Sequence, residues 1–135
     1  NYYPRTLRLQ SWEVQEGTFD YKYSGSNNID EVAWYYENSG AKNEEGTTQN
    51  VGLKEANQLG LYDCSGNVWE WCYDTGNLGN ISEETSYIYD ASQSVRKIGG
   101  GAWNDDACRC FATNYINYNS SNRVNDCGFR IVRTI

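Results

Sequence analysis

The sequence predicts an α+β fold built from short strands and loops, with little long helix. The 135 residues contain 13 glycines but only 1 proline, and Ser, Asn and Asp recur throughout, which indicates frequent turns. The 12 Tyr, 5 Trp and 3 Phe supply most of the apolar area available for a core. A chain of this length fits one domain, which we place at residues 1–135.

The clearest strand signal lies at residues 68–74, where apolar or aromatic side chains occupy both faces of a period-two pattern, as in a central strand. Residues 98–103 carry glycines that suit close backbone packing, and residues 128–135 alternate apolar and basic side chains, so both are expected to be strands. Residues 75–95 receive no assignment. The remaining expectations are strands at 5–9, 20–29 (leading into a turn) and 51–53, an aromatic strand or helical turn at 32–36, a solvated loop at 37–50, and a tight connection at 57–63.

The charge distribution argues against a nucleic-acid partner. The net charge is −7; residues 104–135 carry 4 basic and 3 acidic side chains (+1), which leaves 7 basic and 15 acidic ones (−8) in residues 1–103. No basic stripe is therefore present to neutralise phosphates. No apolar run is long enough to span a membrane. The chain begins at Asn1 without Met or a signal peptide, as expected for a mature form, a fragment or a chain missing its first residues.

The 24 residues from Asn104 to Cys127 use a restricted alphabet. Lys, Glu, Gln, Trp and Met are absent there, although residues 1–103 contain 10 Glu, 5 Gln, 5 Trp and 4 Lys. Every residue of the segment can be written by a codon that ends in a pyrimidine, and none of the five missing types can. The pattern is what adenine-directed mutagenesis of Asn codons would leave. The alternative is a polar, tyrosine-rich loop of accidental composition.

Several motifs, in order along the chain, carry a family resemblance. They are Tyr23-Ser24-Gly25-Ser26, Val32-Ala33-Trp34-Tyr35, Asn57 to Asp63, Ser65 to Trp71, Gly100 to Trp103 and Gly128-Phe129-Arg130. The chain resembles the formylglycine-generating enzyme, or sulfatase-modifying factor, domain, a subtype of the C-type lectin-like fold made mostly of short antiparallel strands and loops. Within that superfamily it is similar to the variable proteins diversified by retroelements. Residues 8–14 depart from the family pattern and are shorter than it, and the upstream half of the family domain is missing.

Departures from the family's pattern argue against enzymatic activity here. The family's oxidases hold copper with two cysteines, whose positions fall on Asp105 and Cys110, and a carboxylate cannot replace a soft thiolate. No His is available as a general base. Of the five cysteines, Cys108 and Cys127 fall within the restricted segment. The other three, Cys64, Cys72 and Cys110, belong to the scaffold, and we expect the last two to lie close together as thiols or as a disulfide.

No cofactor is expected, with calcium as the one alternative. Trp103-Asn104-Asp105 matches a tripeptide of calcium-dependent lectins, but the companion proline loop is missing, because the only proline is Pro4. The resemblance places a structural calcium at Asn67, Val68 and Glu70. The alternative there is a turn at Asn67 and a buried Arg paired with Glu70.

We expect residues 104–127 to be a variable, ligand-binding surface on a fixed frame, as paratope loops are on a sandwich. Its partner would be a protein on another cell or host surface, which places the chain at a cell or virion surface or outside the cell. A copper oxidase and a non-variable structural or carbohydrate-binding domain are the alternatives. The expected frame positions are Trp103, Ala107, Arg109, Cys110, Ala112, Ser120, Ser121, Arg123 and the Gly128-Phe129-Arg130 strand. The expected ligand-binding residues are Asn104, Asp105, Asp106, Cys108, Phe111, Thr113, Asn114, Tyr115, Ile116, Asn117, Tyr118, Asn119, Asn122, Val124, Asn125, Asp126 and Cys127.

Overall fold

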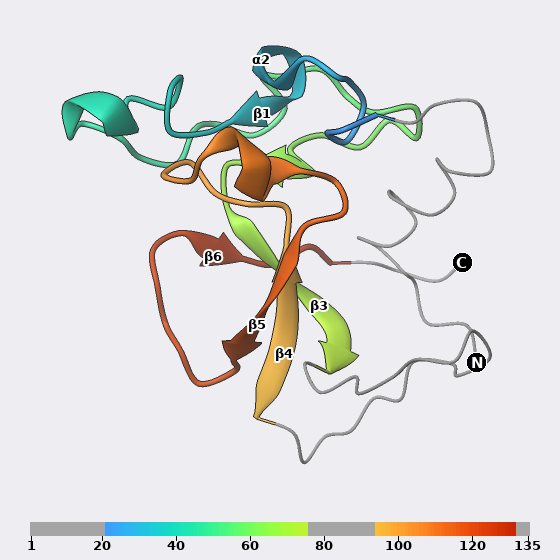
Figure 1. Ribbon diagram of the computed structural model, residues 1–135, viewed down its shortest axis with the longest axis vertical. Coiled ribbons are helices and arrows are strands. Elements are labelled where there is room, and N and C mark those ends of the chain that lie inside the picture. The colour runs from blue at the N-terminus through green and yellow to red at the C-terminus, as the bar shows by residue number, and fades with distance from the viewer. Residues whose placement is uncertain (1–20, 76–93, 132–135) are drawn as a thin grey trace.

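An irregular layer of loops and short elements packs on one end of a twisted four-stranded sheet (Figure 1). The computed structural model describes residues 21–75 and 94–131. The expected strand at 5–9 and most of the unassigned stretch 75–95 lie outside these residues. The elements, in chain order, are α2 (Ile29–Val32), β1 (Ala33–Trp34), the 3-10 turn η1 (Ala41–Asn43), β2 (Ser65–Gly66), β3 (Trp69–Thr75), β4 (Val95–Gly99), the 3-10 turn η2 (Ala107–Cys110), β5 (Tyr115–Asn119) and β6 (Cys127–Gly128).

The sheet has the order β5-β4-β3-β6, so the predicted central strand is confirmed as β3. The pairs β3–β4 and β4–β5 are antiparallel, whereas β3–β6 is parallel. An irregularity between Trp71 and Thr75 bends β3 along its pairing with β4. In the other layer, β1 and β2 form a two-stranded parallel pair. None of the helices within the described ranges has the length and apolar character needed to cross a membrane.

Two apolar clusters hold the layers together. The sheet cluster is built on Trp69, Ile98 and Ala102 from β3, β4 and the turn after β4. The upper cluster contains Tyr23, Val32, Tyr35 and Cys110, and therefore joins the first loop, α2 and η2. Partly buried side chains complete each cluster: Trp71, Trp103, Ile116, Tyr118 and Cys127 in the first, and Ile29, Ala107 and Phe111 in the second.

Helix α2 is a single turn because its sequence supplies a start signal and an early stop. The Oδ1 atom of Asn28 accepts from the N–H of Asp30 at 3.3 Å, which caps the helix. Ala33 then adopts an extended conformation and begins β1. The alternative left open for residues 32–36, strand or helical turn, is resolved by this division between Val32 and Ala33.

Glycines account for two differences between prediction and structure. Residues 51–53 form an exposed turn and not a strand, because Gly52 has φ +74°. The strand expected at 98–103 ends at Gly99, since Gly100 and Gly101 have φ values of +95° and +73°. The close packing expected of these glycines is confirmed: a Cβ on Gly101 would lie 2.9 Å from Sγ of Cys110.

Three further expectations need correction or completion. In the described part of 20–29, the only pairing is an isolated bridge between Tyr23 and Ser26, so this stretch is a turn and not a strand. Of the strand expected at 128–135, the described residues contribute only Gly128, at the end of β6. The tight connection at 57–63 is confirmed, because the N–H of Asn57 donates to Leu61 O at 2.9 Å.

Replacing Gly66 tests the contact between β1 and β2. A Cβ at this position would overlap the carbonyl oxygen of Trp34 and lie 2.9 Å from its nitrogen, so Gly66→Ala should cost about 3 kcal/mol of unfolding free energy in urea titrations. The matched control is Gly52→Ala, where φ is nearly the same but nothing lies within 4 Å. It should cost only the backbone strain of about 1–2 kcal/mol. Equal losses of unfolding free energy in the two variants would show that the close approach of Gly66 to Trp34 adds no cost.

Candidate ligand-binding surface

The segment from Asn104 to Cys127 runs from the upper layer to both edges of the sheet. It passes through η2, descends as the edge strand β5, and returns through a loop to β6 at the opposite edge (Figure 1). The segment is therefore not only a polar loop, since β5 within it pairs with β4 over five residues. It is part of the fold and of the surface at the same time.

Backbone atoms fix the start of this segment. The N–H of Trp103 donates to Asn67 O at 2.9 Å, and the N–H of Tyr36 donates to Asp105 O at 3.0 Å. The Asp105 carboxylate turns inward and accepts from the N–H of Ala102 at 3.0 Å. Burial raises the pKa of Asp105, and hydrogen bonds from Ala102 and the Trp69 side chain oppose this rise.

Backbone atoms also fix the middle and the end. The N–H of Ala112 donates to Lys22 O at 2.8 Å, and the N–H of Ser120 donates to Ser94 O at 2.7 Å. At the end of the segment, the N–H of Trp69 donates to Asp126 O at 2.7 Å. These bonds do not depend on which side chain occupies the position in the segment, so the path of the backbone can survive changes of side chain.

Ten of the seventeen predicted ligand-binding residues are exposed. On β5 the exposed and partly buried positions alternate, and the exposed Tyr115 retains 57% of its accessible surface. Val124 in the returning loop is 41% exposed. The exposed set is Asn104, Asp106, Cys108, Thr113, Tyr115, Asn117, Asn119, Asn122, Val124 and Asn125.

The other seven predicted residues are partly buried, so the expectation that the segment's side chains point outward fails for them. The ring of Phe111 packs on Tyr23 at 5.4 Å between centroids, and that of Tyr118 packs on Trp71 at 6.0 Å. The Asn114 amide donates to Arg109 O at 2.7 Å and so supports the backbone. The seven are Asp105, Phe111, Asn114, Ile116, Tyr118, Asp126 and Cys127.

The expected frame positions also divide. Cys110 is fully buried, and Trp103, Ala107 and Ala112 are partly buried. Five positions expected to be fixed are exposed: Arg109, Ser120, Ser121, Arg123 and Phe129.

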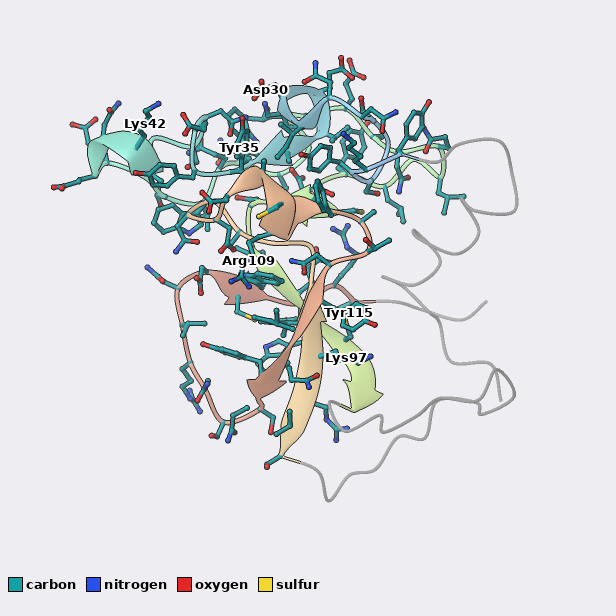
Figure 2. The ribbon with its side chains drawn as sticks, in the orientation of Figure 1. Asp30, Tyr35, Lys42, Lys97, Arg109 and Tyr115 are labelled. Carbon is teal, nitrogen blue, oxygen red and sulfur yellow. The ribbon has the colours of Figure 1, made fainter. Side chains whose placement is uncertain are left out.

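One residue outside the segment shares its surface and was missed from the sequence. Lys97 of β4 lies beside Tyr115 of β5, with its Nζ 4.1 Å from the centre of the tyrosine ring (Figure 2). The cation stabilises the ring in one orientation. The period-two pattern of β4 places Lys97 on the face opposite the buried Ile98, but only the pairing with β5 reveals its neighbour.

The residues at the family's copper positions do not fit copper. Cys110 is fully buried, and burial raises the pKa of its thiol to about 12, with the Asp105 carboxylate adding to the rise. The other position offers an inward carboxylate instead of a second thiolate, whereas Cu(I) is held by soft sulfur ligands. Within residues 21–75 and 94–131, no group of three or more Cys, Asp or Glu side chains is arranged to hold a metal ion.

No disulfide joins Cys72 to Cys110, so that alternative is not formed. Their expected proximity stays a prediction. Only Cys108 is exposed. Cys127 is partly buried, and burial, followed by the charge of Asp126, raises its pKa to about 11.

Asn67 lies in a turn, and Glu70 forms an ion pair with Arg130. Asn67 has φ +64°, and its side chain bonds the backbone of Gln49 through both Oδ1 (2.9 Å) and Nδ2 (3.2 Å). Glu70 is buried and accepts two hydrogen bonds from Arg130, from Nη2 at 2.6 Å and Nε at 3.1 Å. Arg130 also donates to Tyr62 O at 2.9 Å, and so joins the residues after β6 to the loop before β2.

Comparison with protein families shows which family the chain belongs to. The model of the sulfatase-modifying factor enzyme 1-like domain matches residues 10–135. The chain belongs to this family. The sulfatase-modifying factor domain and its C-type lectin-like fold are thereby confirmed, as is the α+β character with little helix.

Similar proteins agree with this membership. The chain is 34% identical to the Paenibacillus barcinonensis protein named chaperone protein LppX, over 85% of this chain and 42% of that protein. Treponema denticola variable protein 1 superposes with a TM-score of 0.73 and 34% identity, covering 94% of this chain and 45% of that one. This similarity confirms the resemblance to variable proteins.

Two further structures share the domain's fold. The CarF crystal structure superposes with a TM-score of 0.67 and 25% identity, over 96% of this chain and 44% of that chain. PvdO from Pseudomonas aeruginosa superposes with a TM-score of 0.65 at 24% identity, over 91% and 48%, which bears on the fold alone. The sulfatase-modifying factor domain described here spans less than half the length of each of these relatives.

Cys110 should make the domain's stability fall at alkaline pH. Its folded-state pKa of about 12 lies above the ordinary value of 9.0, so its contribution is complete below pH 9 and is lost as the pH rises from about 9 to about 12. Urea titrations at pH 8 to 11 should show this loss, with a slope of at most about 1.4 kcal/mol per pH unit from one group. Cys110→Ala should flatten the slope, and a residual slope is expected from Cys127, Tyr23 and Tyr35, whose pKa values burial also raises.

The matched control for this experiment is Cys108→Ala, because Cys108 is exposed. It should lower the slope much less than Cys110→Ala does, because its charge effect on the pKa of Cys110 is smaller than that of burial. If both variants lower the pH dependence of the unfolding free energy equally, Cys110 is not its cause.

Proposed function

We propose that this chain is a ligand-binding display domain whose exposed residues between Asn104 and Cys127 contact the partner. The observation that carries the proposal is the way the segment is held. Backbone bonds to Tyr36, Lys22 and Ser94 fix its path, while ten of its side chains are exposed. Such an arrangement separates folding from recognition, as immunoglobulin loops do.

The exposed residues suit a protein partner. Tyr115 and Val124 offer apolar contact area, and five exposed asparagines offer donors and acceptors (Asn104, Asn117, Asn119, Asn122 and Asn125). Tyrosine combined with small polar residues is the composition of antibody paratopes. The net charge of −7 makes nucleic acid unsuitable as the partner. We place the partner on another cell or host, and this chain at a cell or virion surface or outside the cell.

The restricted alphabet of residues 104–127 supports diversification by a retroelement, and similarity to Treponema denticola variable protein 1 supports it independently. The coding DNA provides the test. Codons for positions such as Asn104, Tyr115 and Cys127 should end in C or T, with an asparagine-rich near-repeat beside a reverse transcriptase gene. Purine-ending codons or an invariant segment in sister strains would favour the non-variable structural or carbohydrate-binding domain.

The domain would act without catalysis and without a cofactor. The buried thiol of Cys110 and the inward carboxylate of Asp105 support this against the copper-dependent oxidase of the same family. Turnover of a cysteine peptide with copper would overturn it. For calcium, the expected result is that a chelator leaves the melting temperature unchanged, because Glu70 is already paired with Arg130. A rise in melting temperature with added calcium would contradict this expectation.

Substitutions at exposed and at partly buried positions of the segment should differ in how much they lower the free energy of unfolding. Replacing exposed Asn104, Asn122 and Asn125 by Ser, Tyr or Asp should change the free energy of unfolding by about 0.5 kcal/mol or less each, because they leave the backbone bonds intact. Replacing inward Tyr118 or Phe111 by Ala should cost about 3 kcal/mol. Denaturant titrations measure both.

Binding specificity should depend on the exposed residues, and folding on the partly buried ones. In a library of the full chain randomised at the ten exposed positions, selection against a panel of purified surface proteins should yield folded binders with distinct specificities. A library randomised at Phe111, Ile116 and Tyr118 should yield few folded members. Folded members of the first library that never differ in binding would refute the display function.

A further inference from the structure

Within residues 21–75 and 94–131, the edge strand β5 carries unpaired backbone groups on the same residues that carry its exposed side chains. The register pairs Val95 with Asn119 and Gly99 with Tyr115, and the N–H of Ser120 donates to Ser94 O. In an antiparallel ladder, bonded and non-bonded pairs alternate. The bonded pairs are therefore Ser94–Ser120, Arg96–Tyr118 and Ile98–Ile116.

Both backbone groups of a strand residue point to the same side, so Tyr115, Asn117 and Asn119 direct theirs away from β4. Among the described strands, β5 has a neighbour on this one side only. The carbonyl of Asn119 is used by the N–H of Asn122, which closes the following turn at 3.0 Å. No other described residue bonds the N–H of these three residues or the C=O of Tyr115 and Asn117, and this edge offers those groups to a partner.

We propose that this edge binds an extended segment of the partner protein as an added strand. The inference rests on the proposed display function and specifies the partner's conformation. An added strand supplies backbone donors and acceptors at two-residue spacing, which matches the spacing of Tyr115, Asn117 and Asn119. Its affinity comes from main-chain bonds that persist whatever side chains diversification installs, while the exposed side chains of the same three residues choose among partners.

The edge lacks the features that normally prevent pairing. Residues 115–119 (Tyr-Ile-Asn-Tyr-Asn) include no proline, no charge and no bulge in their pairing with β4. A second copy of this chain is disfavoured as the occupant, because each copy carries a net charge of −7. Lys97 holds the ring of Tyr115 on the sheet face, 4.1 Å from its Nζ, and so steadies the side chain beside the edge.

The test uses a panel of twelve-residue peptides selected from a random library against the full chain. Asn117→Pro removes an edge N–H that β4 does not use, so the fold should persist, which melting checks. The matched variant Asn117→Ala removes the same side chain and keeps the N–H. Asn117→Pro should weaken every peptide by more than about tenfold, whereas Asn117→Ala should weaken some and spare others.

A second measurement leaves the protein unchanged. Each selected peptide is N-methylated at one position at a time. Methylation at alternate positions should abolish binding, and methylation between them should have little effect. This period-two pattern keeps the proposal testable even where Asn117→Pro disturbs folding.

Several outcomes overturn the inference. They are the selection of no peptides, N-methylation without period two, Asn117→Pro no worse than Asn117→Ala across the panel, and a dimer in solution that Asn117→Pro dissociates. Asn117→Ala and Tyr115→Ala could alter peptide binding while Asn117→Pro weakens it no more than Asn117→Ala. In that case the display function stands and the added strand is wrong. If none of the three affects any peptide, both proposals fail.

Discussion

Main-chain hydrogen bonds between the segment 104–127 and the rest of the domain are the constraint on which this structure depends. The segment is fixed at its start by Asn67 and Tyr36, near its middle by Lys22, and after β5 by Ser94. Each bond joins backbone to backbone, and none requires a given side chain within the segment. The two apolar clusters in turn hold these partners in place, because they unite the strands and loops from which the bonds arise.

The same segment contains the two positions that correspond to the copper-binding cysteines of the family's oxidases. The position where the family's oxidases carry a first cysteine is Asp105, and here its carboxylate bonds the backbone of Ala102. The second position, Cys110, is packed against Gly101 and belongs to the upper cluster. Both residues therefore help to hold the start of the segment in place. Under the proposed function, the domain would use the family's fold with a different set of residues.

Sequence reasoning succeeded where one pattern dominated. The central strand β3 was predictable because Trp69, Trp71 and Tyr73 recur at period two, and the tight connection at 57–63 was predictable from its turn residues. It failed at Val51 to Leu53, where an exposed, left-handed glycine interrupts a short apolar run. Strand β5 was missed because asparagine is a poor strand former, and pairing with β4 overrides that preference. The inward position of the Asp105 carboxylate was missed. Its hydrogen-bond donors, the N–H of Ala102 and the indole of Trp69, come close to it only in the folded chain.

The alternation along β5 limits how much diversity such a domain could use. Mutagenesis directed at adenines does not distinguish Tyr115, which faces solvent, from Ile116, which packs in the core. Under the proposed diversification, a share of each generation of variants would be lost to misfolding before it met any partner. The working repertoire would then be far smaller than the number of codon combinations, and the inward positions would set the yield of each round.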